Sequence, residues 1–483
     1  MNHLLGHIGL RSTPSDYCCR SLASVLGLNV SFPGNTTYLA TQESYWSLQE
    51  ASLSPTCIVI PKTAQDISEA ISIVSSIESC RFAIKGHSHA PAAGFANIND
   101  GVAIDMTRLS SVAVNSDHTV ASVGAGASWL DVYQYLDSLG LAIAGGRNGA
   151  VGVAGLTLGG GISYFAPRVG WACDNAVNFE LVLASGEIVD ANATCHPELF
   201  RALKGGGNNF GIVTRIDFAA FPQGQILGGN VVNDISYRGA VFEAFAEIAT
   251  APEYDIYASL VTGLVFSTAT KEWSLSTTAI YTKPVSNPPV YQNLRKIPRT
   301  ADTLNITNLS TLANETAPPL LNWAFFTGTY GVSATLLSRI FDSLNTTIYN
   351  FIIPGGISWS VAFEPLPTVI TQHGDQNGGN SLGTSPKDGN TFVMLLTGIW
   401  SNTSSDALVE KTAQKMVEDI NGIARSMGLL NDFQYINYAD PSQDPIGSYG
   451  QLNVKRLRDV SKMYDPKGVF QLQVPGGFKL WSH

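Results

Sequence analysis

Glycine is concentrated in three short segments between residues 85 and 211, and this clustering limits what the chain can fold into more than any other feature. The segments are KGHSHAPAAGFAN (85–97), GGRNGAVGVAGLTLGGG (145–161) and KGGGNNFG (204–211). Because glycine has no side chain, such loops let backbone N–H groups approach a polyanion and adopt positive φ angles. Any one segment alone is explained by tight turns between buried strands. Three of them, bracketed by predicted strands, favour a bound dinucleotide.

None of the common phosphate-binding or hydrolase motifs accounts for these segments. The chain has no G-x-x-x-x-G-K-[ST] sequence, and no G-x-G-x-x-G sequence lies between a predicted strand and helix, so a P-loop and a Rossmann site are not supported. H-E-x-x-H and G-x-S-x-G are also absent. His87 and His89 are close together on a loop, but no carboxylates or cysteines accompany them at ligand spacing, so we predict no metal site. The residues alone predict a large anionic cofactor without naming it.

The overall composition excludes several classes of protein. Of the 483 residues, 45% are hydrophobic and 14% are charged, against about 25% charged in an average domain, which excludes a disordered chain. The formal net charge of −10 removes the attraction on which nucleic-acid binding depends, so we predict no nucleic-acid partner. No apolar run approaches the roughly 18 residues of a membrane helix, so we expect no membrane span.

Interleaved strand and helix patterns predict an α+β fold. Thr63 and Asp66 have the spacing of a capping box and predict a helix over 63–77. In the first half of the chain we also predict strands at 56–61, 81–86 and 101–107, a hairpin at 111–126, a helix at 128–140 and a strand pair at 177–191. From about residue 225 the strands and helices are separated by Pro-rich and Asn/Thr-rich connectors, which predicts a second α+β domain.

The second half and the tail follow the same kind of pattern. The predicted strands there are 263–268, 273–282 and 391–400, and the predicted helices are 334–345 and 407–428. Residues 452–472 predict a helix that stops near Asp465 and Pro466 and is followed by a short strand.

The six cysteines and the glycosylation sequons bear on the compartment. Cys18, Cys19, Cys57 and Cys80 cluster before residue 81, and we expect at least one disulfide from the Cys18/Cys19 pair to Cys57 or Cys80, with buried free thiols as the alternative. Cys173 and Cys195 are expected to be free. N-x-[ST] sequons lie at Asn29, Asn35, Asn192, Asn305, Asn308, Asn314, Asn345 and Asn402. They favour a secreted or secretory-pathway glycoprotein, although residues 1–20 are a poor signal peptide.

Six landmarks in order along the chain resemble one known family. They are YWSLQEASLSPTCIVIP, FAIKGHSHAPAAGFANI, VGVAGLTLGGGISYFAPRVGWACDN, ALKGGGNNFGIVT, YINYAD and YDPKGVFQ. From about Tyr45 to Leu480 the chain resembles a fungal berberine bridge enzyme-like FAD-linked oxidase of the vanillyl-alcohol oxidase superfamily. The resemblance implies a PCMH-type FAD-binding domain of two α+β subdomains, covered by a substrate domain of the seven-stranded type with a large antiparallel sheet.

The domain boundaries follow from this resemblance together with the change in composition near residue 225. We expect a disulfide-tethered N-terminal segment at 1–50, the FAD-binding domain at 51–224 and the substrate-binding domain at 225–430. Residues 431–483 are expected to return to the FAD domain as a berberine bridge enzyme-like C-terminal segment.

The family attaches FAD to a histidine after the first glycine loop, and the alignment of residues 82–98 places that histidine at His89. His87 falls where relatives often have glycine. The alternative is that His89 only hydrogen-bonds a phosphate. Some relatives form a second bond through a cysteine, but this chain has Asn148 there, so the predicted link is mono-covalent. The predicted cofactor-binding residues are Lys85, Gly86, His87, Ser88, His89, Gly94, Asn97, Gly145, Gly146, Val151, Gly152, Gly155, Leu156, Gly159, Gly160, Gly161, Asp174, Asn175, Gly211, Ile212, Val213 and Asn437.

The resemblance also assigns roles around the flavin ring. Val151 matches the family's oxygen gate, where a small β-branched residue admits dioxygen; the alternative is plain packing. Leu156 replaces a histidine of plant relatives. Tyr438, the last residue of YINY, matches the catalytic base of several relatives, although an unperturbed phenol has a pKa of about 10 and needs help to act as a base. The alternative for Tyr438 is a buried structural tyrosine.

Together these features predict an FAD-dependent oxidase that passes hydride from a small organic substrate to covalently bound FAD, with O2 reduced to hydrogen peroxide. The substrate is expected to be a fungal secondary metabolite, such as a phenolic or polyketide alcohol. The alternatives are a carbohydrate oxidase, a flavin-dependent cyclase or isomerase, and a binding protein without turnover. Trp359 and Trp400 suit substrate stacking, but core packing is the favoured interpretation. The expected partners are the substrate and O2, and the expected state is a monomer.

Overall fold

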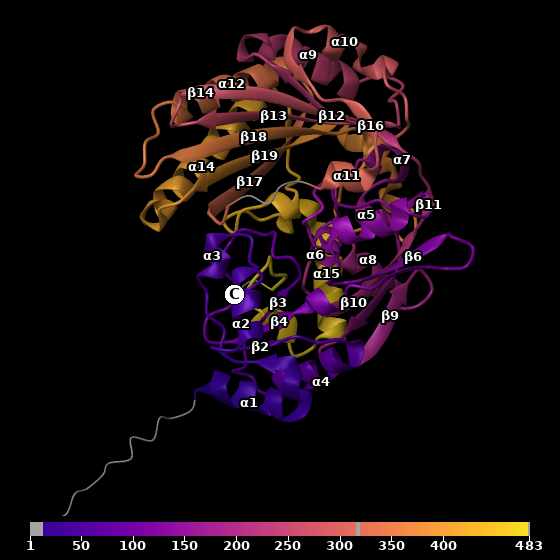
Figure 1. The fold of residues 1–483 in the computed structure, drawn as a ribbon, viewed down its shortest axis with the longest axis vertical. Coiled ribbons are helices and arrows are strands. Elements are labelled where there is room, and N and C mark those ends of the chain that lie inside the picture. The colour runs from indigo at the N-terminus through magenta and orange to yellow at the C-terminus, as the bar shows by residue number, and fades with distance from the viewer. Residues whose placement is uncertain (1–12, 315–318, 482–483) are drawn as a thin grey trace, which may run out of the picture.

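The computed structural model describes residues 13–314 and 319–481, which form three main β-sheets with helices packed against them (Figure 1). The chain begins with α1 (Pro14–Leu26), α2 (Thr36–Glu43) and α3 (Leu48–Ala51). The first sheet has four strands in the order β1 (Val30–Ser31), β2 (Cys57–Val59), β4 (Val102–Asp105) and β3 (Phe82–Lys85). β2 and β3 both run parallel to β4, and α4 (Ala64–Val74) connects β2 to β3.

The second sheet is five-stranded, and all of its strand pairs are antiparallel. Its order is β5 (Val112–Val114), β6 (Val120–Gly124), β10 (Ile212–Ala219), β8 (Ala176–Val182) and β9 (Ile188–Asn192). The helices between these strands are α5 (Trp129–Asp137), α6 (Val153–Leu158), α7 (Ala166–Val169) and α8 (Pro197–Leu203), and a short pair joins β7 (Leu141–Ala142) to β11 (Phe221–Pro222). One hydrophobic core includes residues of both sheets, so this part of the chain is a single packed unit.

The third sheet has nine strands and lies above the other two in Figure 1. Its long strands are β12 (Ile226–Asn233), β14 (Glu272–Tyr281), β13 (Ala258–Ser267), β18 (Ile357–Leu366), β19 (Thr391–Trp400) and β17 (Asn322–Gly331), in that order. The short strands β15 (Arg299–Asp302), β16 (Asn305–Thr307) and β20 (Leu430–Asn431) pair with β12 and β17. With them the sheet has nine strands, so the seven-stranded expectation, which came from the family resemblance, is wrong.

Helices cover one face of the third sheet and leave the other face toward the first two sheets. The covering helices α9 (Arg238–Ala249), α12 (Ala334–Ile348) and α14 (Asp406–Ser426) share a second hydrophobic core with the strands (Figure 1). Trp359 and Trp400 are buried in this core, which confirms the core-packing interpretation. The smaller helices α10 (Gln292–Lys296), α11 (Leu309–Ala313) and α13 (Thr368–Thr371) lie in the connections.

The C-terminal tail returns to the first sheet. α15 (Gln451–Tyr464) ends before Asp465 as predicted, but the strand expected after it is wrong, because Val469–Leu472 is a helical turn, α16. The carboxylate of Asp465 accepts hydrogen bonds from the backbone N–H groups of Val469 and Phe470 at 2.8 and 2.7 Å, which stabilises the first turn of this helix. Beyond it, Gln473 accepts a backbone hydrogen bond from Phe82 of β3.

Most of the strands and helices predicted in the two halves of the chain are present. The capping box of α4 is formed as predicted, with the Thr63 hydroxyl accepting from the Asp66 N–H at 3.1 Å. The hairpin over 111–126 appears as β5 and β6, and the pair over 177–191 as β8 and β9. Local periodicity and capping residues were sufficient there because each element pairs with a neighbour close in sequence.

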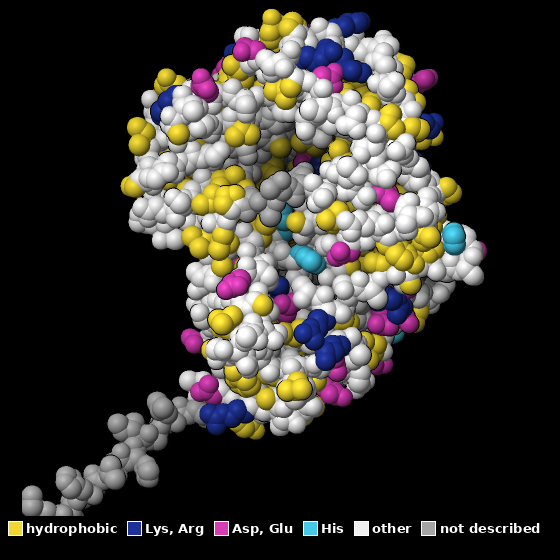
Figure 2. Space-filling view, viewed as in Figure 1, with side chains coloured by type: hydrophobic (Ala, Val, Ile, Leu, Met, Phe, Trp, Pro, Cys, Tyr) yellow, Lys and Arg dark blue, Asp and Glu magenta, His cyan; other side chains and the backbone are white. Residues whose placement is uncertain are grey.

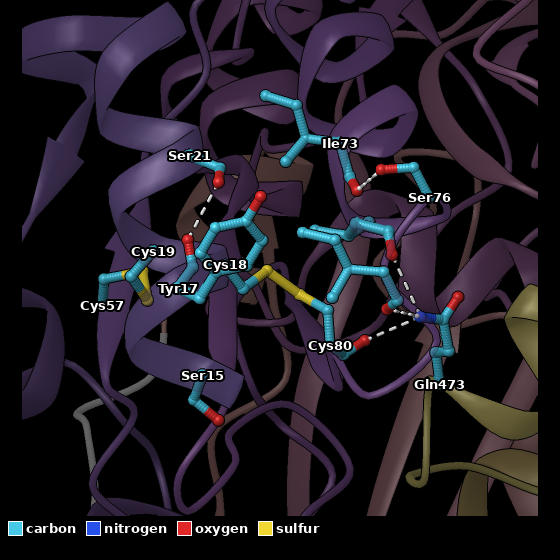
Figure 3. The surroundings of a disulfide bond; sticks show 12 residues. Ser15, Tyr17, Cys18, Cys19, Ser21, Cys57, Ile73, Ser76, Cys80 and Gln473 are labelled. Atoms are coloured by element: carbon cyan, nitrogen blue, oxygen red, sulfur yellow. Dashed lines mark hydrogen bonds between the residues drawn. A yellow bond between two sulfur atoms is a disulfide. The ribbon is translucent and has the colours of Figure 1, made fainter. Parts of the chain in front are cut away.

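Two disulfides tie α1 to the first sheet, which confirms the expectation of at least one bridge. Cys18 is bonded to Cys80 just before β3, and Cys19 is bonded to Cys57 in β2 (Figure 3). The side-chain amide of Gln473 lies beside the first bridge and donates a hydrogen bond to the carbonyl of Cys80 at 3.0 Å (Figure 3). Cys173 is a buried free thiol and Cys195 an exposed one, as expected.

Two glutamine side chains join the lower part of the molecule to β17. Gln49 donates from Nε2 to the carbonyl of Trp323 at 2.7 Å and accepts from the Trp323 N–H at 3.1 Å. Gln443 makes the same pair of bonds with Thr327, at 2.8 and 3.0 Å. Each glutamine side chain therefore pairs with one backbone N–H and one backbone C=O at the edge of the sheet, as a neighbouring strand would.

None of the helices in the described ranges is long and apolar enough to cross a membrane.

Candidate functional site

A cavity of about 910 Å³ lies between the glycine-rich loops and the uncovered face of the third sheet. Figure 2 shows the hollow between the upper and lower parts of the molecule, with histidine side chains at its edge. It is bounded from above by side chains of β13, β14, β17, β18 and β19. Many of the predicted site residues line it: Gly86, His87, Ser88, His89, Val151, Gly152, Gly155, Leu156, Gly159, Gly211, Ile212, Val213, Asn437 and Tyr438.

The first glycine loop presents unsatisfied hydrogen-bond donors to this cavity. The backbone N–H groups of His87, Ser88 and His89 have no hydrogen-bond partner among the described residues. Ser88 has a φ of +50°, and its buried hydroxyl has no hydrogen-bond partner in the described part of the chain. Successive N–H groups around a left-handed residue form an anion-binding concavity, so this loop has the donors that a phosphate group needs.

The two histidines of this loop are both neutral at physiological pH. Burial lowers the pKa of His89 to about 4. Burial also lowers the pKa of His87, whose Nε2 lies 3.0 Å from the carbonyl of Gly126. Only the His89 ring stacks on an aromatic neighbour, the indole of Trp46, at a centroid distance of 4.3 Å and an interplanar angle of 24°. A neutral imidazole at position 89 keeps a nitrogen lone pair available for bonding.

The second glycine loop passes close to other parts of the site. A side chain at Gly152 would meet the backbone nitrogen of His87 at 3.0 Å, and one at Gly159 would meet Oδ1 of Asn437 at 1.9 Å. Asn437 in turn donates from Nδ2 to the carbonyl of Leu156 at 3.0 Å. Glycine is therefore required for close approach at positions 152 and 159, and Asn437 anchors the C-terminal segment to α6.

Other predicted cofactor residues lie outside the cavity lining. Lys85 forms a buried ion pair with Asp105, Nζ to Oδ2 at 3.2 Å. Asn97 donates to the carbonyls of Glu50 and Leu53, and the N–H of Gly94 donates to the carboxylate of Glu50. These groups shape the first loop from behind, and their contact with the cofactor stays a prediction.

The remaining predicted residues support the second loop. Gly145 and Gly146 pack against the indole of Trp129, where any side chain would clash. Gly160 and Gly161 have positive φ angles and pair through their carbonyls with the N–H groups of Cys173 and Ala172. Asp174 and Asn175 are buried; Asp174 accepts from the N–H of Trp171, and Asn175 donates to the carbonyls of Val169 and Trp171. Their contact with the cofactor also stays a prediction.

Tyr438, which also lines the cavity, belongs to a three-residue polar cluster. Its hydroxyl donates to Oε1 of Glu364 at 2.9 Å and accepts from Nη2 of Arg147 at 2.5 Å, and Arg147 and Glu364 form an ion pair at 2.8 Å. Oε2 of Glu364 is buried and has no hydrogen-bond partner within residues 13–314 and 319–481. Arg147 comes from the second glycine loop and Glu364 from β18, so three distant segments build the cluster.

The electrostatics of this cluster keep the phenol protonated in the resting protein. Burial raises the pKa of Tyr438 well above its ordinary value of 10, and the guanidinium of Arg147 only partly opposes this. Burial alone would lower the pKa of Arg147. The carboxylate of Glu364 outweighs this effect and raises the pKa above its ordinary value, so Arg147 stays charged. A protonated tyrosine that donates to a carboxylate can pass its proton on while it accepts another, which is the chemistry of a proton relay.

Sequence reasoning missed Arg147 and Glu364. Arg147 lies inside the glycine segment 145–161 and was its single cation. Glu364 is the one acidic residue of ISWSVAFEPL (357–366), a strand otherwise without charge. A single charged residue in an otherwise apolar strand indicates a functional site, because burying a charge is costly. The sequence does not show, however, that Arg147 and Glu364 contact each other.

Most of the other side chains that the sheet adds to the lining are apolar, and acidic residues also line the cavity. Trp323, Phe325 and Leu395 line the cavity from the sheet. The acidic residues Asp406, Glu410 and Asp440 also line it. Burial raises the pKa of Glu410, and the neighbouring carboxylates of Asp440 and Asp406 raise it further. Within the described lining, Arg147 is the only lysine or arginine, and it is already paired.

Comparison with known proteins adds the family to this geometry. Residues 55–192 match the family described as FAD binding domain, and residues 434–474 match the family described as berberine and berberine like. The FAD-dependent monooxygenase drtC of Aspergillus calidoustus is 34% identical over 485 residues, covering 98% of this chain and 92% of that protein.

Solved structures share the fold at low sequence identity. Xylooligosaccharide oxidase from Myceliophthora thermophila C1 superposes with a TM-score of 0.77 at 19% identity, covering 97% of this chain and 99% of that one. Glucooligosaccharide oxidase from Acremonium strictum, which carries 6-S-cysteinyl, 8α-N1-histidyl FAD, has a TM-score of 0.75 at 19% identity, covering 96% and 100%. The fold is the α+β fold of PCMH-type FAD-binding oxidases. With its FAD-binding region and its full-length relatives, the chain belongs to the berberine bridge enzyme-like family of FAD-dependent oxidoreductases.

Proposed function

We propose that this enzyme is an oxidase that carries FAD on His89, oxidises a small organic alcohol or phenol, and reduces O2 to hydrogen peroxide. The observation that carries the proposal is that the Tyr438–Arg147–Glu364 cluster and the ring of His89 line one cavity. FAD supplies, when bound, the acceptor for the hydride that leaves the substrate, and O2 takes up the two electrons.

The residues of the first glycine loop fit FAD. The unpartnered N–H groups of residues 87–89 and the unpartnered hydroxyl of Ser88 are donors for a diphosphate, and no side-chain carboxylate of the described residues occupies them. The predicted cofactor-binding role of Gly86, Gly152, Gly155 and Gly211 follows from the same lining, because backbone groups there reach the cavity without a side chain between.

The covalent link is proposed at His89 on the state of its imidazole. Its lowered pKa leaves a ring nitrogen unprotonated. Attachment joins that nitrogen to the 8α carbon of FAD; one hydrogen leaves the carbon and one leaves the imidazole, and O2 accepts both as hydrogen peroxide. The glucooligosaccharide oxidase is named for a histidyl and a cysteinyl bond. Here Asn148 replaces the expected cysteine, so we propose the histidyl bond alone.

Tyr438 is the proposed catalytic residue for the proton. As the substrate hydroxyl loses its proton to the Tyr438 oxygen, the phenol releases its own proton to Oε1 of Glu364, to which it already donates at 2.9 Å. Arg147, whose Nη2 bonds to both of these oxygens, holds them in position for the transfer. The relay removes the difficulty that a buried tyrosine with a raised pKa cannot act as a base alone.

The lining favours an aromatic or polyketide-derived substrate over an oligosaccharide. Trp323, Phe325 and Leu395 give the sheet side of the cavity apolar surfaces on which an aromatic substrate can pack. Val151 lies on the lining of the same cavity, where its small side chain is proposed to admit O2.

Anaerobic reduction of the purified enzyme with a panel of aromatic alcohols, phenols and oligosaccharides tests the substrate class. Aerobic turnover in ¹⁸O2 then distinguishes the outcomes. One hydrogen peroxide per product, with no ¹⁸O in the product, supports an oxidase. Incorporation of ¹⁸O would instead support the monooxygenase chemistry for which drtC is named, and product without peroxide or label would support a cyclase or isomerase.

We further propose a monomeric glycoprotein of the secretory route. Two disulfides require an oxidising compartment, and the sequons at Asn35, Asn305, Asn308 and Asn314 are exposed. Loss of mass on glycosidase treatment of protein from a fungal host, with light scattering for the oligomeric state, tests both statements.

A further inference from the structure

Trp46 lies between the proposed attachment histidine and the substrate-side sheet. Its indole is 4.3 Å from the His89 ring and 4.3 Å from the Trp323 ring, measured between centroids. The planes of Trp46 and His89 are inclined by only 24°, so the two rings are stacked. Trp46 itself does not belong to the described lining of the cavity, so it is placed to act on His89 rather than on a substrate.

The segment that carries Trp46 is held to the first glycine loop on one side. The hydroxyl of Ser47 donates to the carbonyl of Pro91 at 2.8 Å. The buried carboxylate of Glu50 accepts from the N–H of Gly94 at 3.2 Å and from the N–H of Ala96 at 2.6 Å. These bonds fix residues 45–50 relative to the loop that bears His89.

On its other side the same segment is held to β17. The N–H of Leu48 donates to the carbonyl of Leu321 at 2.8 Å. Gln49 makes its two hydrogen bonds with the backbone of Trp323, the residue whose ring contacts Trp46 at an interplanar angle of 33°. Trp46 therefore contacts both His89 and Trp323, and hydrogen bonds hold its segment to the parts of the chain that carry these two residues. Its indole cannot move without breaking contacts on one side.

A ring held in this way restricts the imidazole beside it. Rotation of His89 about its side-chain bonds would push its ring into the indole, because stacked rings at 4.3 Å leave no space between them. The indole also excludes water from one face of the imidazole. Bond formation is sensitive to such placement, since an error of about 1 Å costs roughly 100-fold in rate.

We propose that Trp46 is a positioning residue that holds the His89 imidazole in the orientation required for its bond to FAD. The inference rests on the proposed covalent link at His89. The motif YWSLQE (45–50) thereby acquires a role: Trp46 orients the histidine, while Gln49 and Glu50 anchor the segment to the sheet and to the loop.

The test follows covalent flavin over time in full-length wild type, Trp46→Phe, Trp46→Leu and Trp46→Ala. Each protein is incubated with added FAD and precipitated with acid at intervals, and the flavin in the pellet is measured. We expect attachment to slow about 10- to 100-fold in Trp46→Leu and Trp46→Ala and to recover in Trp46→Phe, which keeps a ring to stack. The visible spectrum of the bound flavin is expected to change in the same order.

His89→Ala and Trp273→Leu are the controls. Trp273 contacts Phe266 and Phe341 at the third sheet's core and does not line the cavity, so its replacement reports the general cost of losing a partly buried indole. Normal attachment in folded Trp46→Leu overturns the inference. Complete release of flavin by the wild type overturns the covalent link itself, and with it the role of Trp46. If Trp46→Ala fails to fold, the comparison of Trp46→Leu with Trp46→Phe decides the question.

Discussion

The hydroxyl of Tyr438 lies 2.9 Å from Oε1 of Glu364 although the two residues are 74 positions apart in the chain. The pair joins the short C-terminal segment to β18 of the large sheet, and Arg147 completes it from the glycine loop below. Because each of these segments is anchored in a different part of the fold, the pair exists only when the whole enzyme is assembled. Its most direct consequence concerns proton transfer.

Replacing either partner should slow reduction of the flavin by substrate. Tyr438→Phe removes the group that receives the proton, and Glu364→Gln removes its acceptor, so we expect each to lower the reduction rate by about 10²- to 10⁴-fold. Stopped-flow reduction under anaerobic conditions measures this step. Because the two residues act as one unit, the double variant should be little slower than the single ones. A simple multiplication of the two effects would speak against the relay.

Enlarging Val151 should affect the reaction with oxygen and spare the reaction with substrate. Val151→Leu adds one carbon at the proposed oxygen gate, and we expect reoxidation of the reduced enzyme to slow on the order of tenfold, equivalent to about 1.4 kcal/mol. Mixing substrate-reduced enzyme with aerated buffer measures reoxidation directly. Val151→Ala is the matched control and should reoxidise at least as fast as the wild type. Unchanged reoxidation in Val151→Leu would leave Val151 with a packing role only.

The buried carboxyl of Glu50 should make stability depend on pH. Burial raises its pKa in the folded protein to about 7, above the ordinary value of 4.5. Between these values the folded state binds the extra proton, so this group's contribution to stability falls as pH rises from about 4.5 to 7, by up to about 3 kcal/mol.

Urea unfolding at pH 5 and pH 8 checks this expectation. The loss of stability between the two pH values should be smaller in Glu50→Gln than in the wild type, because the amide does not titrate. Glu69→Gln, a substitution at a partly exposed position of α4, is the control for a general charge effect. Equal losses in wild type and Glu50→Gln would show that Glu50 is already ionised at pH 5.

Removing a disulfide should destabilise the N-terminal part of the chain. The Cys18–Cys80 bridge spans 62 positions, and its replacement by two alanines is expected to cost about 2–4 kcal/mol, mainly because the unfolded chain gains freedom. Urea unfolding of the double variant measures the difference. Cys195→Ala, which removes an exposed free thiol, should leave stability unchanged.

Much of the fold could be predicted from the sequence because its signals are local. The capping box of Thr63 and Asp66, the hairpin near residues 111–126 and the amphipathic helix α14 are all set by neighbouring residues. The turn at Val469–Leu472 was mistaken for a strand because its stabilising group is the buried side chain of Asp465, whose role is invisible in a periodicity pattern.

Only part of the candidate site could be predicted from the sequence. The composition of the glycine loops predicts a cofactor, and the family resemblance predicts the roles of Tyr438 and His89. Arg147 and Glu364 meet across 217 positions, and Trp46 reaches His89 from a separate segment. Such pairings depend on the packing of whole domains, so one sequence does not contain a signal for them.

The two glutamines that hydrogen-bond to β17 also affect how substrate and product can enter and leave the cavity. Gln49 and Gln443 each form two hydrogen bonds with the backbone of β17 and so join the third sheet to the lower half of the molecule. A hinge motion that separated the two halves would have to break all four hydrogen bonds. Substrate and product are therefore expected to exchange without separation of the two halves, and the carboxylates in the cavity lining, Asp406, Glu410 and Asp440, disfavour anionic metabolites there.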